Sequence, residues 1–410
     1  MVINQKRLFH RLLEIGRIGM QEQGGITRLS YTKEEKEAKE LLTYYMLDAG
    51  LEVRQDAVGN LIGRKEGGRS DAPVILTGSH FDTVPQGGMF DGVLGILAAI
   101  EVLQCMNEKR IETEHPIEVI AFVDEEGARF GFGMVGSRAI SGKLRQEDLQ
   151  FTDSQGIALA EAMRQAEFLP DNIADAAAES ENIKAYIELH IEQGKVLENR
   201  NLPVGVVSGI AGHLWIDFRL IGESGHAGAT PMKARRDPMT AAAKMISYID
   251  EETKKYPNAV ATIGKMSVLP GGVNVIPREV EFTIDLRDID ETVRNKIEEN
   301  IVEYAQRICK EQNIELSLNT LQRVSPVKCS KAICDTIERA CIETGQEIFT
   351  LISGAGHDGM QLKDFCPIGM IFIRSRGGVS HNADEWSSED DCGVGADVLY
   401  HTILELAERV

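Results

Sequence analysis

The sequence contains little cysteine, and the cysteines it has form no recognisable framework. There are seven, an odd number, with no Cys-x-x-Cys pair, at positions 105, 309, 329, 334, 341, 366 and 392. A disulfide scaffold usually has an even, regularly spaced set, and a thiolate zinc site uses closely paired cysteines. The pattern argues against both, and we expect reduced, mostly buried thiols.

Long apolar segments are absent as well. No run of about 18 apolar residues, the length that spans a bilayer, occurs in the chain. Residues 1–20 interleave charged side chains such as Lys6, Arg11 and Glu14 with leucines, whereas a signal peptide has a continuous apolar core. We therefore expect a cytoplasmic protein with no membrane partner.

Basic residues are in the minority. The 44 lysines and arginines face 64 aspartates and glutamates, which gives a formal charge of −20. Such a chain repels nucleic acid, so we expect none as a partner. Internal repeats and low-complexity segments are also lacking. With 410 residues, 43% of them hydrophobic, the chain is long enough for two or three domains.

What the sequence does contain is a set of apolar segments that lead into polar side chains. Residues 74–76, 117–123, 185–189 and 368–373 have the continuous apolar character of strands buried in a parallel sheet. The polar residues that follow them are, in the same order, His80 and Asp82; Asp124, Glu125 and Glu126; His190; and Ser380 and His381. The carboxyl ends of parallel strands share one edge, where open α/β sheets bind ligands. We therefore predict an α/β fold with a mostly parallel sheet and a site at this edge.

Between residues 211 and 325 the pattern changes. Apolar residues recur at every second position from Leu214 to Leu220, as in a half-buried antiparallel strand. The predicted order is strand, helix, strand, strand, helix, strand, which is that of a ferredoxin-like α+β domain. We therefore predict a first domain made of residues 1–210 and 326–410, with a second domain, 211–325, inserted into it.

The segment from His80 to Asp91 is a candidate half of a metal site. His80 and Asp82 lie on one face if the strand continues, so that the carboxylate can accept the second ring N–H of the histidine and fix its tautomer. A turn with Pro85 and two glycines separates Asp82 from Asp91 and can fold the chain back. Taken alone, the motif fits a surface hydrogen bond as well as it fits a metal site.

Asp124, Glu125 and Glu126 form an acidic run that is either a solvated turn or part of the same site. At the end of an apolar strand, three carboxylates repel one another unless a cation neutralises them. With a metal present, one carboxylate can be a ligand while its neighbour stays free as a base. A catalytic metal site needs that free group and an open coordination position.

His190 and His381 complete a ligand set with His80, Asp91 and Glu126. Five ligands with one shared carboxylate fit two divalent ions. Imidazole and carboxylate ligands without cysteine suit zinc, manganese, cobalt or nickel. The sequence therefore predicts two divalent metal ions per chain.

Two segments match the Gly-x-Gly-x-x-Gly pattern of dinucleotide-binding loops, at residues 131–136 and 354–359. The first is separated from its strand by the acidic run, and the second contains Asp358. Both would set carboxylates against a pyrophosphate. We therefore expect no nucleotide site.

Three residues of the inserted domain have two interpretations each. His226 lies among small residues that leave room for a ligand, or it is a plain turn residue. Asn274 lies in a Gly-rich segment that either contacts a ligand or only connects two strands. Arg287 either binds a substrate carboxylate through its planar guanidinium or pairs with a flanking aspartate.

Taken together, these segments resemble the dinuclear metallohydrolases of the aminoacylase and carboxypeptidase type. Within them they resemble the branch of N-carbamoyl-L-amino-acid hydrolases, allantoate amidohydrolases and β-ureidopropionases. The similarity extends over almost the whole chain, and the motifs that carry it are residues 78–84, 90–95, 124–131, 188–194, 225–232 and 380–381.

The resemblance implies a role for each ligand. His80 and His190 would hold one ion each, with His381 and Glu126 as further ligands and Asp91 as the bridge. The first domain would be the metal-binding catalytic domain, and the second would be a lid through which a homodimer forms.

The resemblance also implies the catalytic and substrate-binding residues. Glu125 would be the general base, Asp82 would orient His80, and His226 would stabilise the oxyanion in the site of a partner subunit. The implied substrate contacts are Gln193, His213, Asn274, Arg287 and His357.

The predicted reaction is hydrolysis of a carbamoyl (ureido) amide on a small carboxylate substrate. We expect N-carbamoyl-L-amino acids to yield an L-amino acid, ammonia and carbon dioxide. Allantoate is the first alternative substrate, and β-ureidopropionase or aminoacylase/peptidase activity follows. A binding protein with a structural metal is the alternative outside enzymes, and a spare carboxylate at Glu125 argues against it.

Overall fold

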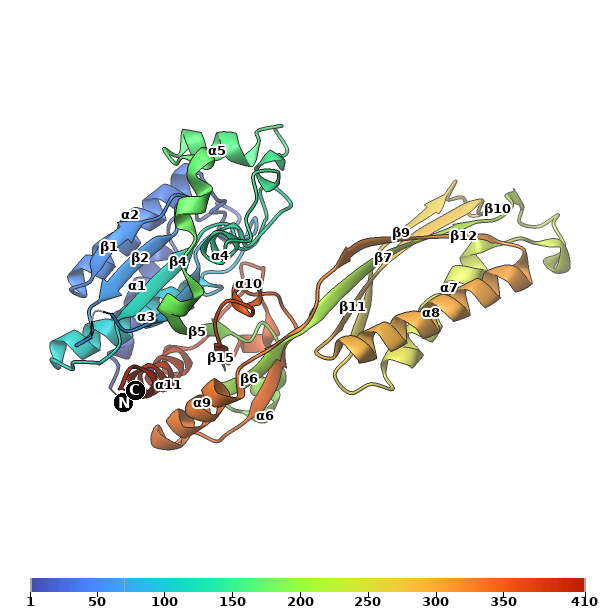
Figure 1. Cartoon of the computed structure of the whole chain (residues 1–410). Coiled ribbons are helices and arrows are strands. Elements are labelled where there is room, and N and C mark those ends of the chain that lie inside the picture. The colour runs from blue at the N-terminus through green and yellow to red at the C-terminus, as the bar shows by residue number, and fades with distance from the viewer. Residues whose placement is uncertain (1, 70, 409–410) are drawn as a thin grey trace. The chain divides into compact units, whose positions relative to one another are not determined.

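The computed structural model describes residues 2–69 and 71–408. The chain forms two compact units, one of Met1–Ser208 with Cys329–Val410 and one of Gly209–Lys328, which includes the predicted second domain (Figure 1). Among the described residues, no helix combines the length and the apolar character needed to cross a membrane.

A sheet of nine strands forms the first unit, except that β13 and the last two residues of β6 fall within the residue range of the second unit. Its order is β1-β2-β4-β3-β5-β15-β6-β13, and β14 pairs with β6 beside this path. The four central strands, from β4 to β15, run parallel, and antiparallel strands flank them on both sides. The strands are β1 (Glu52–Gln55), β2 (Leu61–Lys65), β3 (Val74–His80), β4 (Ile117–Phe122), β5 (Ile183–Ile191), β6 (Val204–Ile210), β13 (Val327–Lys328), β14 (Thr350–Ser353) and β15 (Ile368–Ile373). The predicted α/β class with a mostly parallel sheet is confirmed.

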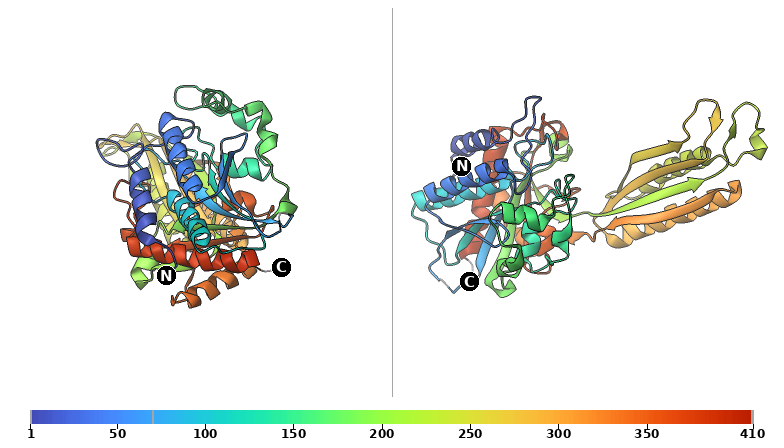
Figure 2. Two further views of the ribbon diagram at one scale, coloured as in Figure 1. Left: turned by 90° about the vertical axis from the view of Figure 1, so that its left-hand side faces the viewer. Right: turned by 90° about the horizontal axis from the view of Figure 1, so that it is seen from above.

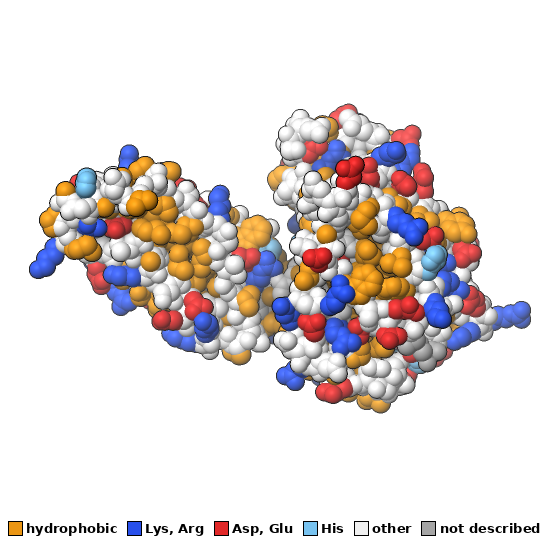
Figure 3. Space-filling model, turned by 180° about the vertical axis from the view of Figure 1, so that it is seen from behind, with side chains coloured by type: hydrophobic (Ala, Val, Ile, Leu, Met, Phe, Trp, Pro, Cys, Tyr) orange, Lys and Arg blue, Asp and Glu red, His pale blue; other side chains and the backbone are white. Residues whose placement is uncertain are grey.

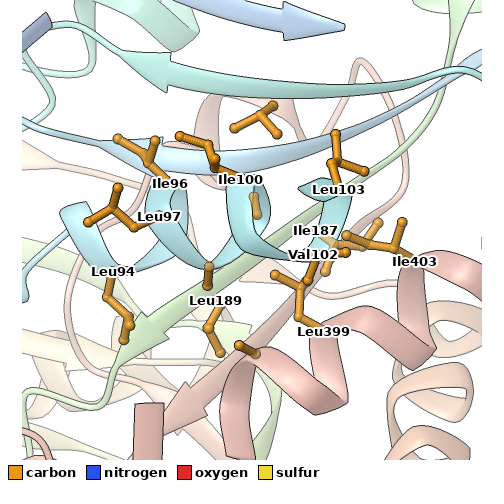
Figure 4. Packing of buried hydrophobic residues seen from close by; sticks show 14 of the residues in the cluster. Leu94, Ile96, Leu97, Ile100, Val102, Leu103, Ile187, Leu189, Leu399 and Ile403 are labelled. Carbon is orange, nitrogen blue, oxygen red and sulfur yellow. The ribbon is translucent and has the colours of Figure 1, made fainter. Parts of the chain in front are cut away.

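Helices surround this sheet, and α3 is the most deeply buried of them. Residues 93–106 of α3 are all buried, as expected of a helix that is apolar on every side. Its leucines and isoleucines pack against Ile187 and Leu189 of β5 and against Leu399 and Ile403 of α11 (Figure 4). The helices of the unit are α1 (Gln5–Ile15), α2 (Lys33–Asp48), α3 (Val93–Glu108), α4 (Val135–Ile140), α5 (Leu159–Gln165), α6 (Val196–Arg200), α9 (Lys331–Glu343), α10 (Gly359–Leu362) and α11 (Glu389–Glu408). α1 and α11 lie side by side (Figure 2).

The second unit contains a four-stranded antiparallel sheet with the order β12-β7-β11-β9. Along β7 every second residue from Leu214 to Leu220 is buried, so the predicted alternation is present. These residues pack with α7 and α8, which pack against each other. The elements are β7 (Gly212–Ile221), β8 (Gly225–His226), α7 (Pro238–Thr253), β9 (Val260–Leu269), β10 (Val275–Ile276), β11 (Glu279–Asp288), α8 (Glu291–Gln312) and β12 (Glu315–Arg323).

The register of the parallel strands brings their polar ends together. His80 of β3 is opposite Phe122 of β4, and His190 of β5 is opposite Phe372 of β15. β5 also pairs with β3, so the two histidines end neighbouring strands. Gly78 makes this packing possible: its φ is +143°, and a Cβ there would lie 1.9 Å from the carbonyl oxygen of Ile120.

We predict that Gly78→Ala lowers the free energy of unfolding by about 1–3 kcal/mol or more, because β4 must move away. Gly264→Ala is the matched control, since Gly264 lies in a strand and has no atom within 4 Å of its Cβ position. Urea denaturation followed by circular dichroism measures both changes. Equal unfolding midpoints for the two variants would contradict the account.

Candidate metal centre

Asp91 lies at the centre of the predicted site, and each of its carboxylate oxygens faces a different group of ligands. Oδ1 lies 3.6 Å from Nε2 of His80 and 3.2 Å from Nε2 of His190. Oδ2 lies 3.2 Å from Nε2 of His381, which is 3.5 Å from Oε1 of Glu126. Two three-residue groups of metal-ligand atoms therefore share Asp91, and all atoms in each group lie within 4.8 Å of one another.

This division differs from the predicted one, in which His80 and His190 hold separate ions. The reason is the sheet order: β3 and β5 are neighbours, and their terminal histidines lie with ring centroids 5.9 Å apart. His381 comes from the loop after β15 and Glu126 from the turn after β4, so these two approach Asp91 from another direction.

Both buried histidines have a defined tautomer in their neutral form. Nδ1 of His80 lies 3.2 Å from the carbonyl oxygen of Asp82, and Nδ1 of His190 lies 2.9 Å from that of Ile191. A carbonyl only accepts, so Nδ1 carries the hydrogen and Nε2 keeps its lone pair for a metal. Nε2 of His190 makes no hydrogen bond with any described residue.

Asp82 contacts the turn formed by the acidic run 124–126, here called the acidic turn, more closely than it contacts His80. Its Oδ1 lies 3.7 Å from Nδ1 of His80, beyond hydrogen-bond distance. The same carboxylate accepts the backbone N–H groups of Glu125 at 3.0 Å and of Glu126 at 3.2 Å. The backbone carbonyl of Asp82, and not the predicted carboxylate, therefore orients the ring, while the carboxylate fixes the turn.

The acidic turn is held on its other side by the glycine segment 131–136. Backbone N–H groups of Met134 and Val135 donate to the carbonyls of Glu125 and Asp124 at 3.0 and 3.1 Å. A Cβ on Gly133 would lie 2.3 Å from the carbonyl oxygen of Glu125. The glycines thus allow close packing on the turn, and these amides are already used by protein carbonyls.

The charges around Asp91 strongly affect one another. Burial and the negative charge of Asp91 raise the pKa of Glu126 to about 7. Burial likewise raises the pKa of Glu125 well above its ordinary value. Although burial opposes it, the neighbouring carboxylates of Asp91, Glu125 and Asp82 raise the pKa of His80 well above its ordinary value. Such a cluster needs positive charge, which bound protons or metal ions can provide.

Gln193 and His357, both predicted to contact substrate, lie beside the ligands. Nε2 of Gln193 donates to Oδ2 of Asp91 at 2.9 Å. The ring of His357 stands edge-on to that of His190, with centroids 4.5 Å apart, and only 2% of the residue is exposed. Its Nε2 lies 2.8 Å from the hydroxyl of Ser353. Both side chains therefore contact predicted ligands, Gln193 through Asp91 and His357 through His190.

His226 and Asn274 of the second unit are brought together by a two-stranded pairing. His226 of β8 is opposite Val275 of β10, and the carbonyl of Asn274 accepts the backbone N–H of Ala227 at 2.9 Å. Nδ1 of His226 accepts backbone N–H groups of the following turn at 3.1 and 3.3 Å. In the neutral ring, Nε2 therefore carries the hydrogen, and the exposed side chain offers a donor.

His213 and Arg287 are cross-strand neighbours in the same unit. Arg287 forms a two-pronged pair with Asp285, with Nε–Oδ1 at 3.0 Å and Nη2–Oδ2 at 2.7 Å, which was the alternative to substrate binding. The ring of His213 stacks on Trp215 at 5.0 Å. Asp285 thus occupies the edge of the guanidinium formed by Nε and Nη2.

Sequence reasoning missed Glu385, which is 3% exposed and contacts the loop that carries Asp91 and the loop that carries His381. Its Oε1 accepts the backbone N–H groups of Phe90 and Asp91, and its Oε2 accepts the hydroxyl of Ser380. The only sequence signal was an acidic residue four positions after His381.

Comparisons with known proteins agree with this geometry. The model of the family described as Peptidase family M20/M25/M40 matches residues 76–405. An N-carbamoyl-L-amino acid amidohydrolase of Geobacillus stearothermophilus is 54% identical over 99% of this chain and 100% of its own. Allantoate deiminase 2 of Glycine max is 35% identical over 93% and 85%. The crystal structure of an amidase of the hydantoinase/carbamoylase family from Burkholderia multivorans is 34% identical, with a TM-score of 0.95 over 99% and 98%.

The contacts of Asp82 lead to a prediction. In Asp82→Asn the NH2 group of the new side chain faces one of the two backbone N–H groups that the carboxylate accepted. Losing a charged acceptor costs roughly 1.5–3 kcal/mol. We expect the amides of residues 125 and 126 to exchange with deuterium about tenfold faster or more, as hydrogen-exchange mass spectrometry measures.

The matched control is Asp56→Asn. The Asp56 carboxylate accepts the backbone N–H groups of residues 58–60 in a turn without ligands. This variant should speed exchange at residues 58–60 and leave exchange at residues 125 and 126 unchanged. Unchanged exchange at residues 125 and 126 in Asp82→Asn would show that the carboxylate does not hold the acidic turn.

Proposed function

We propose, because this chain belongs to peptidase family M20/M25/M40, that it hydrolyses the carbamoyl amide of an N-carbamoyl-L-amino acid with the help of two divalent metal ions. The products are an L-amino acid, ammonia and carbon dioxide. One observation carries the proposal: the two carboxylate oxygens of Asp91 face two separate groups of ligands. The identity to the relative from Geobacillus stearothermophilus supports the substrate class.

The residues present fit a pair of zinc, manganese, cobalt or nickel ions. His80 and His190 would hold one ion and Glu126 and His381 the other, with Asp91 between them. In their neutral form the imidazoles of His80 and His190 carry their hydrogen on Nδ1, which leaves Nε2 free to bind. When bound, such ions polarise a carbonyl oxygen and lower the pKa of a water molecule.

Glu125 is the proposed general base. Its Oε2 lies 3.8 Å from Nε2 of His80, next to the ligands, but it belongs to neither group that shares Asp91. Its backbone N–H is held by Asp82, so the carboxylate stays directed at the site. Glu125 accepts a proton from the attacking water and transfers it to the leaving nitrogen.

His226 is the proposed oxyanion donor. Two backbone N–H groups point at Nδ1, which keeps the donor hydrogen on Nε2. An Nε2–H group donates a hydrogen bond to the negative oxygen that forms when the carbonyl is attacked. Arg235 fixes the turn, because it donates to the carbonyls of Ala227 and Thr230.

We further propose that the second unit forms a homodimer and brings His226 to a partner's site. The edge strand β9 supports this, since no strand among the described residues pairs with its outer side and it exposes Val260, Met266 and Leu269. Hydrophobic side chains gather on the face of this unit that Figure 3 turns to the viewer. Edge strands with exposed apolar residues are ready to pair with another chain. A cytoplasmic location remains a prediction.

The substrate carboxylate is proposed to bind Arg287, with Asn274 and His213 nearby in the same unit. A guanidinium forms two parallel hydrogen bonds with a carboxylate, and Asp285 occupies that geometry in this structure. Allantoate also carries a carboxylate and ureido groups, and the soybean relative supports it as the second candidate.

The test is a comparison of substrates. Protein treated with a chelator and reloaded with manganese or cobalt is assayed for ammonia release from N-carbamoyl-L-methionine, its D-isomer and allantoate, and for cleavage of a dipeptide. We expect the highest kcat/KM for N-carbamoyl-L-methionine, little for its D-isomer, and loss of activity after chelation. Preference for allantoate would establish the second candidate, and cleavage of the dipeptide alone would refute both.

We predict that Glu125→Gln lowers kcat by several orders of magnitude and leaves metal content unchanged, because Glu125 moves a proton without holding an ion. Glu126→Gln is the control, since it removes a ligand and should lose metal as well as activity. Metal analysis after gel filtration, together with ammonia release, separates the two effects. A Glu125→Gln variant with near-normal turnover would disprove its role as base.

A further inference from the structure

We propose that Glu385 is a positioning residue that holds two loops together, so that the ligand Asp91 keeps both oxygens in place. One is the loop of Phe90 and Asp91, called the Asp91 loop, and the other is the loop of Ser380 and His381, called the His381 loop. The inference rests on the metal centre of the proposed function. Glu385 is not a ligand: its carboxylate is occupied by groups of the protein itself. It comes from the loop that precedes α11 and is buried.

The first part of this connection is made to the backbone of the Asp91 loop. Oε1 of Glu385 accepts the N–H groups of Phe90 at 2.9 Å and of Asp91 at 3.1 Å. These two N–H groups lie before the first residue of α3, so the hydrogen bonds inside the helix do not use them. A charged acceptor for two buried N–H groups is worth more than a neutral one. It fixes the backbone from which the Asp91 carboxylate extends.

The second part reaches the His381 loop through Ser380. The hydroxyl of Ser380 lies 2.7 Å from Oε2 of Glu385 and 3.1 Å from Oδ2 of Asp91. It has one hydrogen to donate, and the shorter distance favours Glu385. The hydroxyl oxygen accepts a hydrogen bond from Nε2 of Gln193 at 3.3 Å, and the same Nε2 also donates to Asp91. The carboxylates and the two polar side chains form one network.

Packing around Glu385 supports the same role. A Cβ on Gly88 would lie 2.0 Å from Oε1 of Glu385, so the Asp91 loop is shaped to admit this side chain. The next residue, Trp386, packs edge-on against Phe90 with ring centroids 5.4 Å apart. The two loops are thus joined by an aromatic contact beside the polar one, which limits how far a substitution at position 385 displaces them.

The test measures metal binding directly. Parent protein, Glu385→Ala, Glu385→Asp and Glu385→Gln are treated with a chelator and titrated with manganese by calorimetry. We expect Glu385→Ala and Glu385→Asp to bind manganese about 10–100-fold more weakly, as is usual for groups that orient metal ligands. Glu385→Gln should stay within a few-fold of the parent, because its amide oxygen still accepts both N–H groups.

Asp384→Ala is the matched control, because this neighbouring carboxylate is exposed and its side chain is not in the network. It should bind manganese as the parent does. The melting temperature of each metal-free variant is measured beside it, because a purely structural residue would change stability and leave metal affinity unchanged. If Glu385→Ala does not fold, Glu385→Asp carries the test.

Three results would overturn the inference. They are parent-like affinity in Glu385→Ala, parent-like affinity in Glu385→Asp, and equal weakening in Glu385→Gln and Glu385→Ala. The last would mean that negative charge, and not anchoring of the two amides, supports the ligands. A parent protein that binds no manganese would instead refute the metal centre, so the two failures are distinguishable.

Discussion

The carboxylate of Asp91 lies between three imidazoles in a buried site, and the surrounding structure depends on this arrangement. The close imidazoles of His190, His381 and His80 outweigh burial and hold the pKa of Asp91 well below its ordinary value. The carboxylate therefore stays ionised, with His80 and His190 close to Oδ1 and His381 close to Oδ2. A buried charge of this kind is stable inside a protein only when charged partners and hydrogen bonds compensate for the loss of water.

The fold supplies those neighbours from distant parts of the chain. Parallel strands end at one edge, so β3, β4, β5 and β15 lead their loops to the same place although residues 80 and 381 are far apart in sequence. Close backbone packing at Gly78 and Gly133 keeps β3 and the acidic turn near the ligands. The rigid sheet thus determines the positions of the ligands, while backbone groups determine the direction of the rings and of the turn.

Much of this could be predicted from the sequence, because strand ends are visible in the apolar pattern. His80, Glu126, His190 and His381 follow apolar segments at short distances along the chain, and the inserted unit was indicated by alternation along β7. The pairing of ligands was not predictable, since it depends on which strands are neighbours. The contacts of Asp82 and Glu385 were missed for a related reason: both accept backbone N–H groups of distant turns, and such contacts leave no pattern in sequence.

The most direct test of the shared carboxylate is a crystal structure of the zinc-loaded protein with anomalous diffraction data at the zinc edge. The account predicts two zinc peaks on either side of Asp91, one contacted by His80 and His190 and the other by Glu126 and His381. A single peak, or two peaks that divide His80 from His190, would contradict it.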